Sequence, residues 1–252
     1  MKILYFTGTG NCLSVAKRFE AERLSIPKLI KNNVYEIEDE VVGIIYPVYA
    51  ISIPDMVRKY ISKCKIKADY VFVIATYGST ACGSLHEMKK QLELNGNKAD
   101  YYNSILMVDN YLPFFDIEKQ LSMLKEKNIE NNLNKIVEEV NSRTKKEEKC
   151  GWFNNLASSI GYKIVKQIEK QTPKMFYVND KCISCGVCKK VCPSSNIVQE
   201  PNNKPIFENN CESCLACINN CPKNAIQMKK QRSAKRFRNP EVSLNEIIEA
   251  NN

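Results

Sequence analysis

The first 109 residues alternate short apolar runs with segments of helical periodicity. Continuous apolar runs are typical of parallel strands, because both faces of such a sheet are covered. Helices between successive strands cross over and pack on those two faces. The pattern predicts a doubly wound α/β domain, with strands at 2–6, 34–37, 41–46, 70–76 and 101–108 and helices near 11–24, 54–63 and 83–95.

Residues 117–170 carry mostly helical periodicity, strictest over 153–168. The helix expected there ends in several lysines, which leaves two interpretations open: it packs on its own domain, or it lies on a membrane surface. Its polar face also carries acidic and amide side chains, which favours packing. Pro173 ends the helical pattern.

The remaining residues differ in character from those before them. Residues 174–230 are loop-rich and dense in cysteine, and six cations follow within the ten residues 229–238. We interpret this basic run as a solvated tail or a dock for an acidic partner, followed by one brief helix from 242 to 248. The expected organisation is a sheet domain with a helical extension (1–172), a smaller α+β domain (173–230) and a basic tail (231–252).

Composition places the chain among globular proteins. Of its 252 residues 44% are hydrophobic and 26% are charged, which excludes a disordered or fibrous chain. No stretch approaches the roughly 20 apolar residues that cross a bilayer, and the N-terminal apolar run is too short for a signal peptide. We therefore expect a cytoplasmic location, where the twelve cysteines stay reduced.

Eight of those cysteines form an internal repeat. The spacing C-x2-C-x2-C-x3-C-P occurs twice, 29 residues apart. In this arrangement three thiolates of one run hold a [4Fe–4S] cluster and the fourth ligates the other cluster. Structural zinc is the alternative, but zinc requires neither the third closely spaced cysteine nor the proline. The predicted ligand sets are Cys182, Cys185, Cys188 and Cys221 for one cluster, and Cys211, Cys214, Cys217 and Cys192 for the other.

This segment resembles the bacterial two-cluster ferredoxins at all eight ligand positions. It departs from them at Asn196, where that family commonly has a small apolar residue. The resemblance implies a ferredoxin-like domain that transfers electrons.

A candidate anion-binding loop follows the first strand. Backbone N–H groups converge in a loop of small residues at the start of a helix, where the helix dipole also favours negative charge. A P-loop would need a lysine after the last glycine, and a dinucleotide loop would need a third glycine. A loop without lysine or arginine suits the phosphate of FMN, although a turn without any ligand is the alternative. The loop consists of Thr7, Gly8, Thr9, Gly10, Asn11, Cys12 and Leu13.

The same loop resembles the phosphate loop of flavodoxins, with Cys12 in place of the usual hydroxyl residue. The resemblance implies that the loops after the third and fourth strands flank a flavin ring, with Tyr49 and Tyr77 as ring neighbours. Asn110 and Tyr111 resemble a feature of flavodoxin–ferredoxin fusion proteins of anaerobic bacteria and archaea, which share this order of domains. The two implied loops contain Pro47, Val48, Tyr49 and Ala50, and Thr76, Tyr77, Gly78 and Ser79, the latter continuing to Cys82 and Gly83.

The formal charge of +9 becomes mild once cofactors are counted. Each four-iron cluster with its thiolates carries about −2, so two clusters lower the net charge to about +5. Nucleic acid is therefore disfavoured as a partner. We expect electron transfer between two [4Fe–4S] clusters and FMN, with a redox protein as donor or acceptor. The alternatives are a flavin-dependent reductase of a small molecule or quinone, and a redox-sensing regulator that binds nucleic acid.

Overall fold

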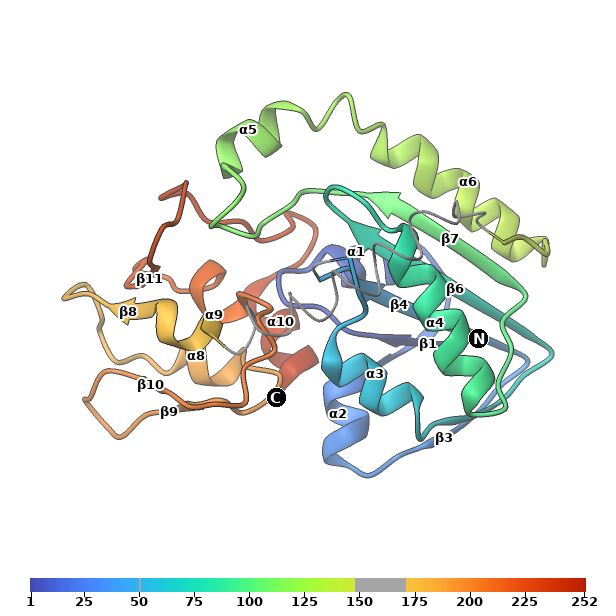
Figure 1. Ribbon diagram of the computed structural model, residues 1–252, viewed down its shortest axis with the longest axis horizontal. Coiled ribbons are helices and arrows are strands. Elements are labelled where there is room, and N and C mark those ends of the chain that lie inside the picture. The colour runs from blue at the N-terminus through green and yellow to red at the C-terminus, as the bar shows by residue number, and fades with distance from the viewer. Residues whose placement is uncertain (50, 148–170) are drawn as a thin grey trace.

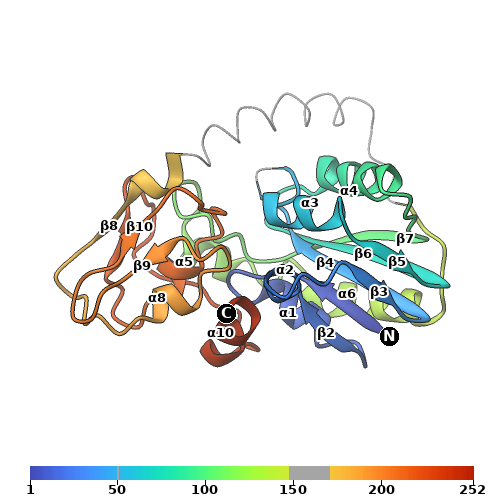
Figure 2. The ribbon, with the colours of Figure 1, turned by 90° about the horizontal axis from the view of Figure 1, so that it is seen from below.

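The computed structural model describes residues 1–49, 51–147 and 171–252. A lobe built on a central sheet and a smaller lobe built from the cysteine-rich segment lie side by side (Figures 1 and 2). Within the described residues, no helix is both long and apolar enough to cross a membrane. Ala50, the side chain of Cys82 and the helix expected over 153–168 lie outside the described part of the chain.

Five parallel strands form the central sheet, in the order β2-β1-β4-β6-β7. Counted within this sheet alone, the order is 2-1-3-4-5, which is that of flavodoxin-like proteins. The connections change direction between β1 and β4, so a crevice opens beyond the carboxyl ends of those two strands. The predicted doubly wound fold is therefore confirmed. The strands are β1 (Lys2–Tyr5), β2 (Glu22–Ser25), β4 (Val41–Pro47), β6 (Tyr70–Tyr77) and β7 (Tyr101–Leu106).

The second strand of the sheet is not the one that the sequence predicts. The helix expected over 11–24 ends at Ala16, and the edge strand β2 follows it. Glu22 and Arg23 are exposed, so this strand has no apolar run to mark it. The apolar run expected to be a strand at 34–37 belongs instead to a separate two-stranded sheet of β3 (Glu36–Glu38) and β5 (Lys65–Lys67).

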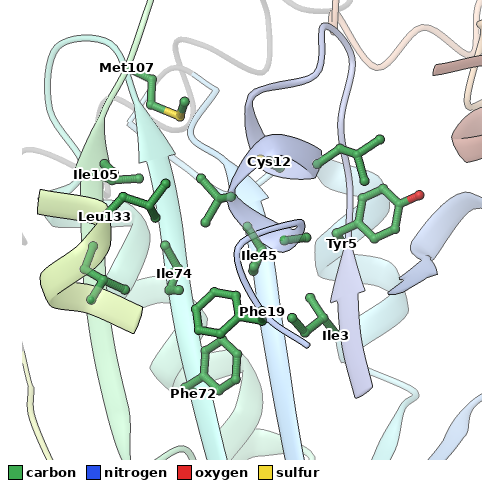
Figure 3. Close-up of a cluster of buried hydrophobic side chains, with 14 of the residues drawn as sticks. Ile3, Tyr5, Cys12, Phe19, Ile45, Phe72, Ile74, Ile105, Met107 and Leu133 are labelled. Carbon is green, nitrogen blue, oxygen red and sulfur yellow. The ribbon is translucent and has the colours of Figure 1, made fainter. Parts of the chain in front are cut away.

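Helices cover both faces of the central sheet because strand side chains alternate between them. Ile3 and Tyr5 point to one face and Leu4 and Phe6 to the other. Figure 3 shows the first of these apolar layers, where Phe19 and Phe72 lie together. One face carries α1 (Asn11–Ala16), α6 (Ile129–Asn141) and α10 (Leu244–Asn251), and the other α2 (Ile26–Lys31), α3 (Asp55–Ile61) and α4 (Cys82–Leu94).

The smaller lobe is built from two similar halves. Each half contains a cysteine run that leads into a one-turn helix, and the strands pair antiparallel, β8 with β11 and β9 with β10. Val108 and Leu112, from the connection after β7, complete its apolar core. This connection leads into α5 (Ile117–Ser122). The elements are β8 (Phe176–Val178), α8 (Val187–Lys190), β9 (Ile197–Val198), β10 (Ile206–Phe207), α9 (Ala216–Asn219) and β11 (Ile226–Met228).

The segment after residue 230 packs in part against the rest of the protein, so the expected tail is not fully solvated. Phe237 and Val242 are buried. Arg236 donates hydrogen bonds to the Ile226 carbonyl oxygen at 3.3 Å and to Oε1 of Gln227 at 3.0 Å. The predicted final helix is confirmed as α10, and Ser243 caps its N-terminus. The guanidinium groups of Arg232, Arg236 and Arg238 donate to acceptors of the protein itself, whereas the lysines of the basic run are exposed.

Candidate functional site

A pocket of about 340 Å³ lies beyond the carboxyl ends of β1, β4, β6 and β7. This is the crevice at which doubly wound sheets bind ligands, and its size falls within the range of small-molecule sites. Twelve of the loop residues predicted to bind the flavin line it. They are Thr7, Gly8, Thr9, Asn11, Cys12, Pro47, Val48, Tyr49, Thr76, Tyr77, Gly78 and Ser79.

Three other residues singled out in the sequence do not line the pocket. Gly10 has a positive φ of 101°, and a side chain there would press against Asn239 and Val242 of the C-terminal segment. Leu13 is buried in the apolar layer under α1. Gly83 is buried in the first turn of α4.

Hydrogen bonds within the loop after β1 hold it in a closed shape. The hydroxyl of Thr7 accepts the N–H of Gly10 at 3.0 Å. The side-chain amide of Asn11 donates to the Val108 carbonyl oxygen at 3.1 Å, and the amide of Asn110 donates to the Thr9 hydroxyl. The loop is therefore tied to the connection after β7, which also lines the pocket.

Cys12 stands where flavodoxins usually have a hydroxyl residue. Its sulfur lies 3.2 Å from the Thr76 hydroxyl oxygen. Burial raises the pKa of the Cys12 thiol to about 12, against a smaller opposing effect of this hydrogen bond. The group is therefore a neutral thiol at physiological pH, and it links the first loop to the end of β6.

Sequence reasoning missed the walls of the pocket that come from distant segments. The connection after β7 supplies Val108, Asp109, Phe114 and Phe115 in addition to the weakly marked Asn110 and Tyr111. This connection has no recognisable sequence motif. Its aromatic residues were the one feature that could have indicated a ligand-binding wall. Ile51 and Thr80 extend the two loops that the resemblance marked, and Ser213, Cys214 and Leu215 come from the second cysteine run.

Two ionisable groups, Asp109 in this wall and Lys127, interact electrostatically. Burial raises the pKa of the Asp109 carboxyl, while the nearby Lys127 opposes that shift. Burial likewise lowers the pKa of Lys127, whose ammonium donates to the Met107 carbonyl oxygen and, at 2.8 Å, to Oε1 of Gln120. Both groups are thus held in a poorly solvated place beside the pocket.

The lining fits FMN. Hydroxyl groups of Thr7, Thr9, Thr76 and Ser79 suit a phosphate and a ribityl chain. The aromatic rings of Tyr49, Tyr77, Tyr111 and Phe115 suit the faces of an isoalloxazine ring.

The eight repeated cysteines line two further cavities in the smaller lobe. Backbone N–H groups of Asn196 and Ala225, which are equivalent positions of the repeat, donate to the sulfurs of Cys192 and Cys221 at 3.3 and 3.2 Å. The departure at Asn196 therefore leaves this contact unchanged. One cavity is lined by Cys182, Cys185, Cys188 and Cys221, and the other by Cys192, Cys211, Cys214 and Cys217.

Zinc is the alternative occupant of these cavities. Tetrahedral zinc, with Zn–S bonds of about 2.3 Å, draws its sulfurs to within about 4 Å of one another. Among the described residues, no group of three or more His, Cys, Asp or Glu side chains is arranged to hold one metal ion. Binding of iron–sulfur clusters in the two cavities stays a prediction.

Comparisons with known proteins give separate matches for parts of the chain. Residues 174–222 match the family described as 4Fe-4S dicluster domain. The pyruvate synthase subunit PorD of Methanocaldococcus jannaschii is 43% identical over 49 residues, and that of Thermotoga maritima is 40% identical over 53 residues. These matches cover 19% and 21% of the chain, and span just over half the length of those relatives (57% and 54%).

Two solved structures resemble the sheet lobe. A flavoprotein of Lactobacillus acidophilus in complex with FMN is 11% identical, with a TM-score of 0.30, over 41% of this chain and 91% of its own. The flavodoxin of Megasphaera elsdenii is 17% identical, with the same TM-score, over 41% and 83%. The fold assignment itself rests on the strand order. The chain therefore joins a parallel sheet of flavodoxin-like order to a segment similar to ferredoxins with two 4Fe-4S clusters.

Proposed function

We propose that this protein transfers electrons between two [4Fe–4S] clusters, held by the repeated cysteines, and an FMN held in the pocket. Clusters pass single electrons and a flavin stores two, so the pair converts one-electron flow into two-electron delivery. We also propose that the working units are those expected from the sequence, 1–172 and 173–230, with 231–252 bound to both.

One observation supports this proposal above the others: a cluster ligand forms part of the pocket wall. Cys214 lines both the pocket and a cysteine cavity. A Cβ atom on Gly8 would lie 2.7 Å from the carbonyl oxygen of Cys214. The loop after β1 (residues 7–13, the anion loop) and the loop of the second cysteine run (residues 211–216, the cysteine loop) are therefore in direct contact. A group in the pocket is therefore adjacent to one in the cavity.

Each set of residues has a distinct task in this function. The loop after β1 binds the phosphate through its N–H and hydroxyl groups. Tyr49 and Tyr77 orient the ring and exclude water from its faces. The cysteines hold the clusters. Hydrogen bonds from backbone N–H groups to the cysteine sulfurs adjust the reduction potentials of the clusters.

Anaerobic purification followed by iron, sulfide and flavin analysis tests the proposal. We expect about eight irons and one FMN per chain. Replacing both Thr7 and Thr9 with alanine should lower the FMN content and leave the iron content unchanged. Eight irons without flavin, even after FMN is added, would refute the flavin half of the proposal, and a protein that holds zinc instead of iron would refute the other half.

A flavin-dependent reductase of a small acceptor is the second candidate, and Asp109 favours it. This carboxyl lines the pocket, and its raised pKa makes it a better proton donor near neutral pH than an exposed aspartate. Turnover of quinones or other small acceptors by the chemically reduced protein, lost in Asp109→Asn, would support a reductase. Reduction of protein acceptors alone would support a carrier.

A further inference from the structure

The two cysteine runs differ at the positions between their ligands. Because 29 residues separate equivalent positions, each residue of the first run has a counterpart in the second. Ile183 is 58% exposed. Its counterpart Glu212 is partly buried, and its carboxylate accepts the N–H of Met56, in the sheet lobe, at 3.0 Å. The first run thus presents an apolar side chain to solvent where the second run contacts the other lobe.

The same contrast holds beside the third cysteine. Lys189 and Lys190 are exposed, whereas their counterparts Ile218 and Asn219 are buried. The second run is therefore suited to burial and the first run to an exposed surface.

A third pair of counterparts, Gly186 and Leu215, shares a left-handed backbone conformation. A Cβ atom on Gly186 would have one neighbour within 4 Å, Oε1 of Gln199 at 3.9 Å. Leu215 is 2% exposed and lines the pocket, although a side chain in this conformation costs roughly 1–2 kcal/mol. The leucine fills the wall between its cysteine cavity and the pocket.

The cysteine-rich lobe that contains the first run is net positive. Residues 174–238 contain twelve cationic side chains and four carboxylates, so two clusters of about −2 each still leave a net positive lobe. The exposed Ile183 and Cys185 form an apolar and sulfur-bearing centre. Exposed lysines lie within two residues of three cysteines of the first cavity. They are Lys181, Lys189, Lys190 and Lys223. An apolar centre with a charged rim is typical of a docking surface. Because the rim is positively charged, it favours an acidic partner.

We propose that electrons enter through the cluster of Cys182, Cys185, Cys188 and Cys221 (the outer cluster), from an acidic one-electron carrier protein docked on this surface. They leave through the cluster of Cys192, Cys211, Cys214 and Cys217 (the inner cluster) to the pocket. Each encounter oxidises one carrier by one electron and reduces the outer cluster by one. Two encounters, with two protons from solvent, supply a two-electron reduction of FMN. The inference rests on the proposed function.

Charge reversal tests the docking surface. The full protein with its cofactors is mixed in a stopped-flow instrument with a reduced plant-type [2Fe–2S] ferredoxin of net negative charge. We expect Lys189→Glu with Lys190→Glu to lower the second-order rate constant at least tenfold at low ionic strength. The difference should vanish near 0.5 M salt, where the Debye length is about 4 Å. Lys90→Glu with Lys98→Glu makes the same charge change on exposed residues of the sheet lobe and should alter the rate less than twofold. Equal effects of the two pairs would overturn the docking surface.

The order of the clusters is tested without removing any ligand. Gly186 lines the outer cavity and Leu215 the inner one, so Gly186→Ala and Leu215→Ala each mark the EPR spectrum of one cluster. In freeze-quenched samples, the first cluster signal to appear after mixing should be the one that Gly186→Ala changes. The signal that Leu215→Ala changes should follow it. The opposite order would overturn the inference.

Failure of this inference can be told apart from failure of the proposed function. Iron and flavin analysis of every variant is done before mixing. A protein that lacks one of the cofactors contradicts the proposed function. A protein that holds both, yet reacts equally well after charge reversal or shows the inner cluster reduced first, contradicts only the assigned path.

Discussion

Adding a single methyl group at Gly8 should disturb the contact between the two lobes. Gly8 lies in the loop after β1, and its φ is not in the left-handed region, so alanine meets no backbone strain there. The obstacle is steric. A Cβ atom would lie 2.7 Å from the Cys214 carbonyl oxygen and 3.3 Å from the Tyr49 hydroxyl. The tyrosine side chain can move aside, but the carbonyl belongs to the backbone of the cysteine loop.

The size of the expected change in stability follows from the cost of overpacking. Overpacking by one methyl group against a backbone atom costs about 1–3 kcal/mol. Separation of the cysteine loop from the anion loop relieves this strain, so Gly8→Ala shifts the local opening equilibrium by that amount. Since 1.4 kcal/mol is a tenfold change, amide hydrogen exchange at 211–216 should accelerate roughly 5- to 140-fold.

Hydrogen–deuterium exchange with mass spectrometry measures this directly in the cofactor-loaded protein. Gly96→Ala is the matched control. Gly96 has a φ of 73° and open space around it, so alanine costs about 1 kcal/mol there without touching the interface. It should lower the thermal unfolding temperature and leave exchange at 211–216 unchanged. Identical exchange of this segment in Gly8→Ala and the native protein would refute the contact between the two loops.

The remaining predictions concern α10 and Cys12. Asn251→Leu removes two buried hydrogen bonds to backbone carbonyls and should cost about 1–3 kcal/mol for each, measured by urea unfolding. Ser243→Ala removes the N-cap of α10 and should cost about 1 kcal/mol, whereas Ser243→Thr keeps the hydroxyl and should retain most of that stability. The hydrogen bond from Lys17, with those from Ser243, lowers the pKa of Glu246 from 4.5 to about 2, so its carboxylate stabilises the fold above pH 4.5 and loses that effect as the pH falls toward 2. The stability difference between Glu246→Gln and the native protein should therefore be constant near neutral pH and shrink below about pH 4. Because burial raises the pKa of Cys12 to about 12, iodoacetamide at pH 8 should leave it unmodified until the protein is unfolded, as read by peptide mapping.

Local patterns in the sequence predict the parts of this structure that form locally. Four of the five main strands are apolar runs of the length that a buried parallel strand requires, so they could be predicted. The anion loop and the cysteine repeat could be predicted as well, because their residue types stand at fixed short spacings. The edge strand Glu22–Ser25 was not predicted, because a strand at the edge of a sheet needs no apolar run.

Contacts between distant segments could not be predicted in this way. Gly8 and Cys214 are in contact although more than 200 residues separate them in the sequence. The sequence pattern around either residue gives no indication of the other. The connection after β7 was equally hidden. It contributes Val108 and Leu112 to the core of the smaller lobe and also forms a wall of the pocket, yet its sequence has no periodicity. Sequence reasoning therefore singled out residues that line the pocket and the two cysteine cavities, and missed the interface that brings them together.

The C-terminal segment shows why charge was a poor guide to that interface. Its cations are conspicuous in the sequence, but amides of two asparagines make several of the contacts between this segment and the two lobes. The backbone N–H of Asn239 donates to the Thr9 carbonyl oxygen at 2.8 Å, and its side-chain amide donates to the Ser14 hydroxyl at 3.0 Å. The amide of Asn251, buried in α10, donates to the carbonyl oxygens of Thr7 at 3.1 Å and Val191 at 3.2 Å, one in each lobe. Loop carbonyls removed from water need donors, and an asparagine supplies them without the cost of burying a charge. The last helix therefore belongs to the candidate site, because it holds the anion loop and the cysteine-rich lobe in one arrangement.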